Sequence, residues 1–147
     1  MQNLNKDQVG YQAPAAILES VLYCDDLETC GHFYEQVVGL RLASSLAGRH
    51  RFYRLRGGML LLFRSEATAN DVIKVNGQVI PPHGTTGSGH LAFSIESESI
   101  GSVSERLKSF KILIESEIEW PNGGYSIYCR DPAGNSIEFA TAKLWYG

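Results

Sequence analysis

The sequence lacks the features of a membrane, secreted or nucleic-acid-binding protein. It has no apolar run approaching the roughly 18 residues that a membrane helix needs. Its first ten residues are polar and lack the apolar segment of a secretory signal, so we expect a cytoplasmic protein without a membrane partner. No basic cluster is present and the formal net charge is −3, which argues against nucleic acid. A small molecule is the partner class that remains.

Cysteine is also scarce. Cys24, Cys30 and Cys129 cannot all pair within one chain and show no metal-type spacing, so we expect them to be reduced and mostly buried. Disorder is excluded by composition, since hydrophobic residues make up 44% of the chain and charged residues 20%. The 147 residues are enough for one compact domain with its own core.

The pattern of apolar residues predicts the same unit twice, after a polar N-terminal arm of residues 1–16. The expected strands are residues 17–23, 40–44, 51–55, 59–63, 90–95, 112–117, 126–130 and 136–141, with helices starting at about residues 27 and 100. Residues 17–147 thus form a single domain of the α+β class, with βαβββ modules at about residues 17–66 and 90–142. Residues 64–89 are expected to be a long linker loop.

Strand alternation sets three polar side chains apart from the apolar face of their strands. Ile137 and Phe139 alternate as a core face does, so Glu138 points the other way. Glu19 and His90, 71 positions apart, take the same place in the first strands of the two modules. If the two sheets meet edge to edge, they enclose a partly open barrel, and all three side chains face its interior.

Two carboxylates and one imidazole are ligand types that hold Mn²⁺, Fe²⁺, Co²⁺, Ni²⁺ or Zn²⁺ with positions left open. The other interpretation is an ordinary one: a histidine that begins a strand is commonly structural, and a glutamate near a strand end is commonly solvated. The residues alone leave both interpretations open.

Several motifs together resemble the vicinal oxygen chelate superfamily, which includes glyoxalases, bleomycin-resistance proteins and extradiol dioxygenases. These motifs are Leu-Glu-Ser-Val-Leu-Tyr-Cys-Asp-Asp-Leu-Glu at residues 18–28, Phe-Tyr at 33–34, Gly-Leu at 39–40, Gly-His-Leu-Ala-Phe at 89–93 and Arg-Asp-Pro-Ala-Gly-Asn-Ser-Ile-Glu at 130–138. The resemblance covers about residues 17–142 and points to the superfamily without specifying a reaction.

The resemblance implies that Glu19, His90 and Glu138 bind one divalent metal per chain. The fourth ligand position of glyoxalase I is taken to fall on Leu62, which cannot bind a metal. The resemblance also implies a glyoxalase-like metalloenzyme, a lyase, isomerase or thiol transferase, acting on a small oxygen-chelating substrate, with Glu138 as ligand and base and Glu19 as the alternative base. A metal-free binding or resistance protein and a ring-cleaving dioxygenase remain the alternatives.

Other residues are weaker candidates for substrate contacts. His83 lies in the linker loop just before His90, and Tyr128 and Arg130 share one face of their strand. All three are candidate substrate-binding residues. The alternative for each is a structural or solvent-exposed side chain without a role in binding. A homodimer is expected from the resemblance, with the modules pairing either within one chain or by exchange between two chains.

Overall fold

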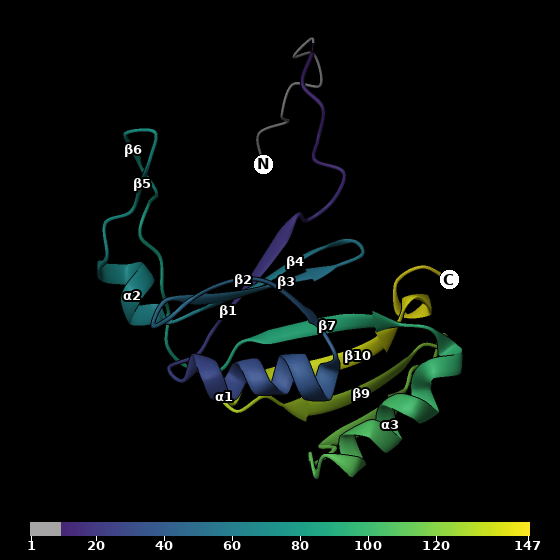
Figure 1. Cartoon of the computed structure of the whole chain (residues 1–147). Helices are drawn as coiled ribbons and strands as arrows, with labels where there is room; N and C mark the ends of the chain where they lie inside the picture. The colour runs from purple at the N-terminus through teal and green to yellow at the C-terminus, as the bar shows by residue number, and fades with distance from the viewer. Residues whose placement is uncertain (1–9) are drawn as a thin grey trace.

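The structure is a computed structural model that describes residues 10–147 of the chain (Figure 1). It contains two four-stranded sheets and few helices, which confirms the predicted α+β class. Residues 10–16 are exposed and form no helix or strand. The first nine residues of the expected polar arm lie outside the described residues.

The elements follow the predicted order of two βαβββ units. The first unit contains β1 (Glu19–Tyr23), α1 (Leu27–His32), η1 (Phe33–Val38), β2 (Arg41–Leu46), β3 (His50–Leu55) and β4 (Gly58–Phe63). The second contains β7 (His90–Ile95), η2 (Ser97–Ser99), α3 (Ile100–Ser109), β8 (Ser116–Glu119), β9 (Tyr125–Arg130) and β10 (Ser136–Thr141), followed by η3 (Ala142–Leu144). The helices among residues 10–147 are too short or too polar to cross a bilayer.

Both sheets have the same topology. The strand orders are β1-β4-β3-β2 and β7-β10-β9-β8, with one parallel pair at the edge of each sheet, β1 beside β4 and β7 beside β10. The other pairs are antiparallel. Figure 1 shows the two sheets as separate layers, and no hydrogen-bonded ladder joins them among the described strands, so the barrel is not closed, in agreement with the predicted partly open arrangement.

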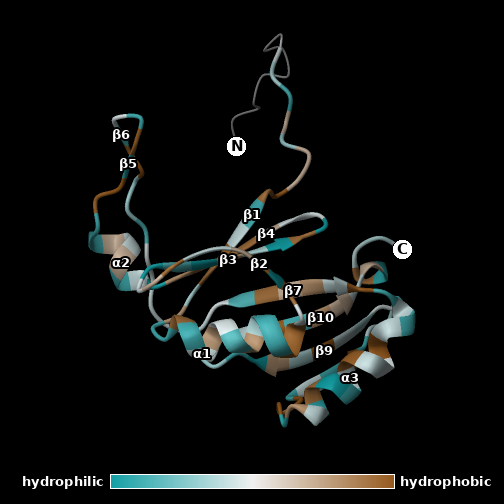
Figure 2. Cartoon of the chain, viewed as in Figure 1, coloured by the Kyte–Doolittle hydropathy of each residue, from teal (hydrophilic) through white to brown (hydrophobic). Residues whose placement is uncertain are grey.

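The linker between the modules has more structure than expected. Residues 64–89 contain a helix, α2 (Ser65–Asn70), and a two-stranded hairpin of β5 (Lys74–Val75) and β6 (Gln78–Val79). The hairpin projects away from both sheets and contains hydrophobic residues (Figure 2), of which Val75 and Val79 are exposed. Its turn residue Asn76 has a positive φ of 49°, which asparagine tolerates better than most residues.

The bounds of several strands also differ from the prediction. The first strand begins at Glu19, two residues later than predicted, and Leu18 just before it is 78% exposed. The strand expected at residues 112–117 is instead Ser116–Glu119. Ile112 and Ile114 pack against the core without joining the sheet. Their apolar side chains therefore reflect core packing and not a strand.

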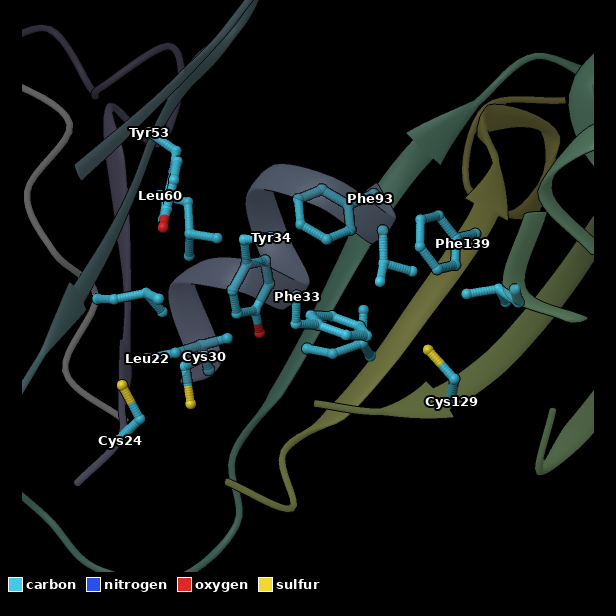
Figure 3. Packing of buried hydrophobic residues seen from close by; sticks show 14 of the residues in the cluster. Leu22, Cys24, Cys30, Phe33, Tyr34, Tyr53, Leu60, Phe93, Cys129 and Phe139 are labelled. Carbon is cyan, nitrogen blue, oxygen red and sulfur yellow. The ribbon is translucent and has the colours of Figure 1, made fainter. Parts of the chain in front are cut away.

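The first helix lies where both sheets can pack on it. Asp26 caps α1 by accepting a hydrogen bond from the Thr29 backbone N–H (3.0 Å), and Gly39 ends the helical segment with a φ of 85°. The helical segment buries Tyr34 against Tyr53 of the first sheet and Phe93 of the second (Figure 3). One core therefore holds both modules in a fixed relation within the chain. The three cysteines are buried and free, as predicted.

Candidate metal centre

His90 and Glu138 meet on the face of the second sheet that is turned away from the core. Their strands are parallel neighbours, with His90 paired to Ser136 and Glu138 two residues further along β10. The His90 Nε2 and Glu138 Oε1 atoms are 3.2 Å apart. Glu138 lies opposite Ile137 and Phe139, as the alternation predicted, yet only 5% of it is exposed.

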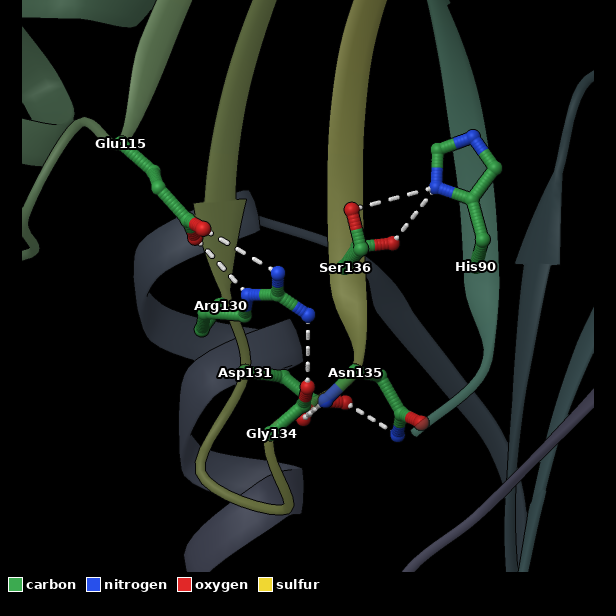
Figure 4. Close-up of polar contacts among 7 residues, drawn as sticks. All are labelled: His90, Glu115, Arg130, Asp131, Gly134, Asn135 and Ser136. Atoms are coloured by element: carbon green, nitrogen blue, oxygen red, sulfur yellow. Dashed lines mark hydrogen bonds and ion pairs between the residues drawn. The ribbon is translucent and has the colours of Figure 1, made fainter. Parts of the chain in front are cut away.

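The other ring nitrogen of His90 is held by the backbone. His90 Nδ1 lies 3.0 Å from the carbonyl oxygen of Ser136 and 3.3 Å from the hydroxyl of the same residue (Figure 4). A carbonyl only accepts hydrogen bonds, so Nδ1 carries the proton in this contact. In the neutral ring the lone pair is then on Nε2, the nitrogen that faces Glu138. A backbone or carboxylate acceptor on the second nitrogen is the usual support of a metal-binding histidine.

A buried relay fixes the carboxylate of Glu138. The Ser126 hydroxyl donates to Glu138 Oε2 at 2.5 Å, and the indole Nε1 of Trp120 donates to the same hydroxyl at 2.8 Å. Because the indole occupies one acceptor site of Ser126, the hydroxyl proton is directed at Glu138. The relay leaves Oε1 free to face His90. Sequence reasoning missed both Trp120 and Ser126, because strand alternation alone does not show which polar side chains touch.

The pair has the donor chemistry of one half of a divalent-metal site. Two donor atoms bound to one first-row ion at about 2.0–2.2 Å and nearly at right angles lie about 3 Å apart, which is the separation of Nε2 and Oε1 here. Imidazole and carboxylate suit the ions predicted from the sequence. The residues present therefore fit a divalent metal.

Glu19 does not join this pair within one chain. It lies at the start of β1, exposed, on the open face of the first sheet. Among residues 10–147, no group of three or more His, Cys, Asp or Glu side chains is placed to hold one ion. The structure thus brings together two of the three predicted ligands and leaves the third on the other sheet.

The strand register corrects the fourth position. Glu19 pairs with Met59 in the first module, as His90 pairs with Ser136 in the second. The counterpart of Glu138, two residues after Ser136, is therefore Leu61 and not Leu62. Leu62 is fully buried beside Leu22 on the core face. The prediction was wrong by one residue because a run of three leucines has no alternation to set the register.

The turn between β9 and β10 anchors the start of β7, where His90 lies. Asp131 accepts hydrogen bonds from the Asn135 side chain (2.9 Å) and from the Tyr34 hydroxyl (2.7 Å), and Asn135 accepts one from the Gly89 backbone N–H (2.7 Å). Burial, followed by the neighbouring Asp131 charge, raises the pKa of Tyr34. The motif at residues 131–135 therefore ties helix, turn and β7 together next to the site.

The candidate substrate-binding residues lie in different surroundings. The His83 ring contacts the Tyr23 hydroxyl through Nδ1 at 2.5 Å, on the open face of the first sheet. The Tyr128 ring stacks near His90, with centroids 6.3 Å apart, and burial followed by the Glu138 charge raises the pKa of Tyr128. The guanidinium of Arg130 is engaged by Glu115 at 2.8 and 3.1 Å and by the Gly134 carbonyl.

Comparison with known proteins places this arrangement in a family. The profile of the Glyoxalase/Bleomycin resistance protein/Dioxygenase superfamily matches residues 16–139, most of the chain. The chain belongs to this superfamily. A crystal structure of lactoylglutathione lyase from Agrobacterium tumefaciens is similar at 38% identity, with a TM-score of 0.84, over 91% of this chain and 98% of that one.

More distant members share the fold with this chain. A glyoxalase/bleomycin resistance protein/dioxygenase from Nocardioides is 25% identical over 90% of this chain and 86% of that one, with a TM-score of 0.68. A fosfomycin resistance protein from Listeria monocytogenes matches at 19% identity and a TM-score of 0.63, over 88% of this chain and 95% of that one. The same fold thus occurs in proteins with different functions.

Proposed function

We propose that this protein is a divalent-metal-dependent enzyme of the glyoxalase-like type, acting on a small substrate that chelates through two oxygens. The observation that carries the proposal is the oriented pair of His90 Nε2 and Glu138 Oε1 at 3.2 Å. The likeness to a lactoylglutathione lyase supports a lyase or isomerase reaction over the other chemistries of the superfamily. The metal-free binding protein and the ring-cleaving dioxygenase remain the alternatives to be tested.

We further propose that two copies of the chain build each site. Glu19 is exposed on the open face of the first sheet, and His90 and Glu138 lie on the open face of the second. Both open faces also leave apolar or small side chains exposed, among them Val21, Leu46 and Ala92. A second copy that sets its first sheet against this second sheet would cover these residues and bring Glu19 to His90 and Glu138. The protein would then work as a homodimer with exchanged modules.

The chemistry divides between the metal and the side chains. His90, Glu138 and Glu19 would hold a divalent metal, which would supply a Lewis acid for the negative charge that develops on the substrate oxygens. Glu138 is the base: it accepts a proton from the carbon beside the substrate carbonyl and returns it to the carbonyl carbon, while the hydroxyl proton of the first carbon passes to the former carbonyl oxygen. Ser126 keeps the carboxylate oriented throughout. Glu19 is the alternative base, since its exposed carboxylate has no such restraint.

The first test is the loss of one carboxylate. Glu138→Gln keeps the shape and the hydrogen bond from Ser126 but removes the charge, so metal affinity measured by calorimetry should fall at least about tenfold. Glu117→Gln, exposed on the opposite face of the same sheet, is the matched control and should bind metal normally. Unchanged affinity in Glu138→Gln, or no metal uptake by the wild type at all, would contradict the metal-dependent proposal.

A mixed dimer separates the two ways of assembling the site. Glu19→Gln and Glu138→Gln chains, each inactive alone, are given different affinity tags and co-expressed. In an exchanged dimer, one site of the heterodimer combines Glu19 of one chain with His90 and Glu138 of the other and is intact. The purified heterodimer should therefore bind half as much metal as the wild type. It should also show half of the wild-type activity on the hemithioacetal of methylglyoxal. If each chain builds its own site, the heterodimer regains nothing.

A further inference from the structure

The arginines of the chain divide into two groups. Of the eight in the sequence, five are held by carboxylates or backbone carbonyls. These five are Arg49, Arg51, Arg64, Arg106 and Arg130. The remaining three, Arg41, Arg54 and Arg56, are exposed and lie together at one end of the first sheet. Their side chains form no hydrogen bond or ion pair with residues 10–147.

A β-bulge places two of them side by side. Arg41 and Leu42 pair with Arg54 and Tyr53, but Ser44 pairs with Phe52, so Ala43 is an extra residue in β2. Because Tyr53 is fully buried and paired residues share a face, Leu42 turns toward the core and Arg41 joins Arg54 on the open face. In a regular register without the bulge, Ala43 would pair with Tyr53 and Leu42 with Arg54, so Arg41 would point toward the core side.

This arrangement is unfavourable unless an anion binds there. Like charges directly opposite on paired strands destabilise a sheet. The two arginines, with Leu42 and Ala43, line a hollow of about 250 Å³. Two arginines that line one hollow are suited to hold a carboxylate, which a guanidinium group can bind with two parallel hydrogen bonds.

The residues paired across the strands from Arg41 and Arg54 form a row that ends at Glu19, one of the proposed metal ligands. Across the open face, Arg41 pairs with Arg54, Arg54 with Met59, and Met59 with Glu19. Arg54 is thus two strands from Glu19, a separation of about 10 Å between their backbones. Met59, the side chain between them, is uncharged. The open face therefore has one row with a carboxylate ligand at one end and two cationic side chains at the other.

We propose that Arg41 and Arg54 bind an anionic end of the substrate while its oxygen pair lies at the metal beside Glu19. This inference rests on the proposed function for the position of Glu19. It defines the substrate class as an acidic small molecule, with a carboxylate about two strand spacings from its chelating oxygens. Arg54 sets the specificity, and Arg41 is brought to it by the bulge at Ala43.

Anion binding can be measured without metal or turnover. Metal-free protein is titrated with glutarate while the arginine side-chain Nε–H signals are followed by NMR. The signals of Arg41 and Arg54 should shift and saturate, and the shifts should vanish in 0.5 M NaCl or in Arg54→Gln. Arg64→Gln, which removes an exposed arginine paired with Glu66, is the charge-matched control and should leave them unchanged. Shifts spread over all exposed arginines would overturn the proposal.

A second measurement uses two hemithioacetals of methylglyoxal, formed with glutathione and with glutathione dimethyl ester. The wild type should show at least a tenfold higher kcat/KM for the acid, and Arg41→Gln/Arg54→Gln should lose this preference while binding metal normally. An unaltered preference in the double variant would overturn the anion site even if the enzyme is active. If the wild type turns over neither adduct, the proposed reaction fails, and the glutarate titration alone decides the anion site.

Discussion

The open faces of the two sheets differ in chemistry although their strands follow the same topology. The face of the second sheet carries an oriented pair, His90 and Glu138, with Ser126 behind the carboxylate. The corresponding positions of the first sheet hold Glu19 and Leu61. Only one half therefore contains a supported ligand pair, and the other contributes a single exposed carboxylate.

The first face carries a different group of side chains at each of its ends. Tyr23, His50, Phe52, Phe63 and His83 form a connected aromatic group at one end. The unpaired arginines lie at the other end. The two modules thus have the same topology, but in the proposed function one holds two of the three metal ligands and the other holds the proposed anion site.

The largest expected effect tests the register that defines this comparison. Leu62→Glu places a carboxylate in the core beside Leu22 with no partner, which should cost about 4 kcal/mol or more and leave the chain unfolded. Leu61→Glu places the carboxylate on the open face of the first sheet, at the position that corresponds to Glu138 in the second sheet. This substitution should cost about 1–3 kcal/mol. Urea unfolding of both variants, monitored by circular dichroism, measures the difference.

The same pair of variants also reports on metal. Leu61→Glu completes the fourth ligand position, so it should bind metal about tenfold more tightly than the wild type, and metal should restore its stability. If Leu62→Glu folds as well as Leu61→Glu, the register in the first sheet is not the one described.

A smaller effect is expected from the relay behind Glu138. Ser126→Ala removes the hydrogen bond to Oε2 but no ligand, so metal affinity should fall about tenfold. Trp120→Phe leaves the serine in place and only frees its hydroxyl to rotate, so the loss should be smaller still. Calorimetric titration of both variants orders the two effects. A Trp120→Phe loss that exceeds the Ser126→Ala loss would show that the indole acts through packing instead.

Sequence alone predicted the order of the elements and the face of Glu138, but not the strand register, the contacts between side chains or the packing of the modules. The period-two pattern around Glu138 set its face correctly, because Ile137 and Phe139 alternate with it. The leucine run at residues 60–62 has no such pattern, and the register there was missed by one residue. The hydrogen bonds of Ser126 and Trp120 depend on contacts between strands that spacing does not encode. The separation of Glu19 from His90 depends on how whole modules pack, which strand patterns do not specify.

The smallest expected effect concerns His50, at the aromatic end of the first face. Its ring stacks on Phe52, with centroids 3.9 Å apart, and its Nδ1 is buried without a hydrogen-bond partner in the described structure. Burial, followed by the charge of Arg49, lowers the pKa of His50 below its usual value. The folded protein therefore favours the neutral ring, whereas the unfolded chain takes up the proton more readily.

The stability contributed by the neutral ring is complete above the unfolded pKa of about 6.5 and is lost as the pH falls from there toward the lower folded pKa. The effect should be about 1 kcal/mol or less, because the ring is only partly buried. His50→Phe keeps an aromatic stack but cannot titrate, so its melting temperature should fall less than that of the wild type between pH 7.5 and pH 5.5. Equal losses would mean that another group titrates over this range and that His50 is protonated without cost, as expected if water reaches its Nδ1.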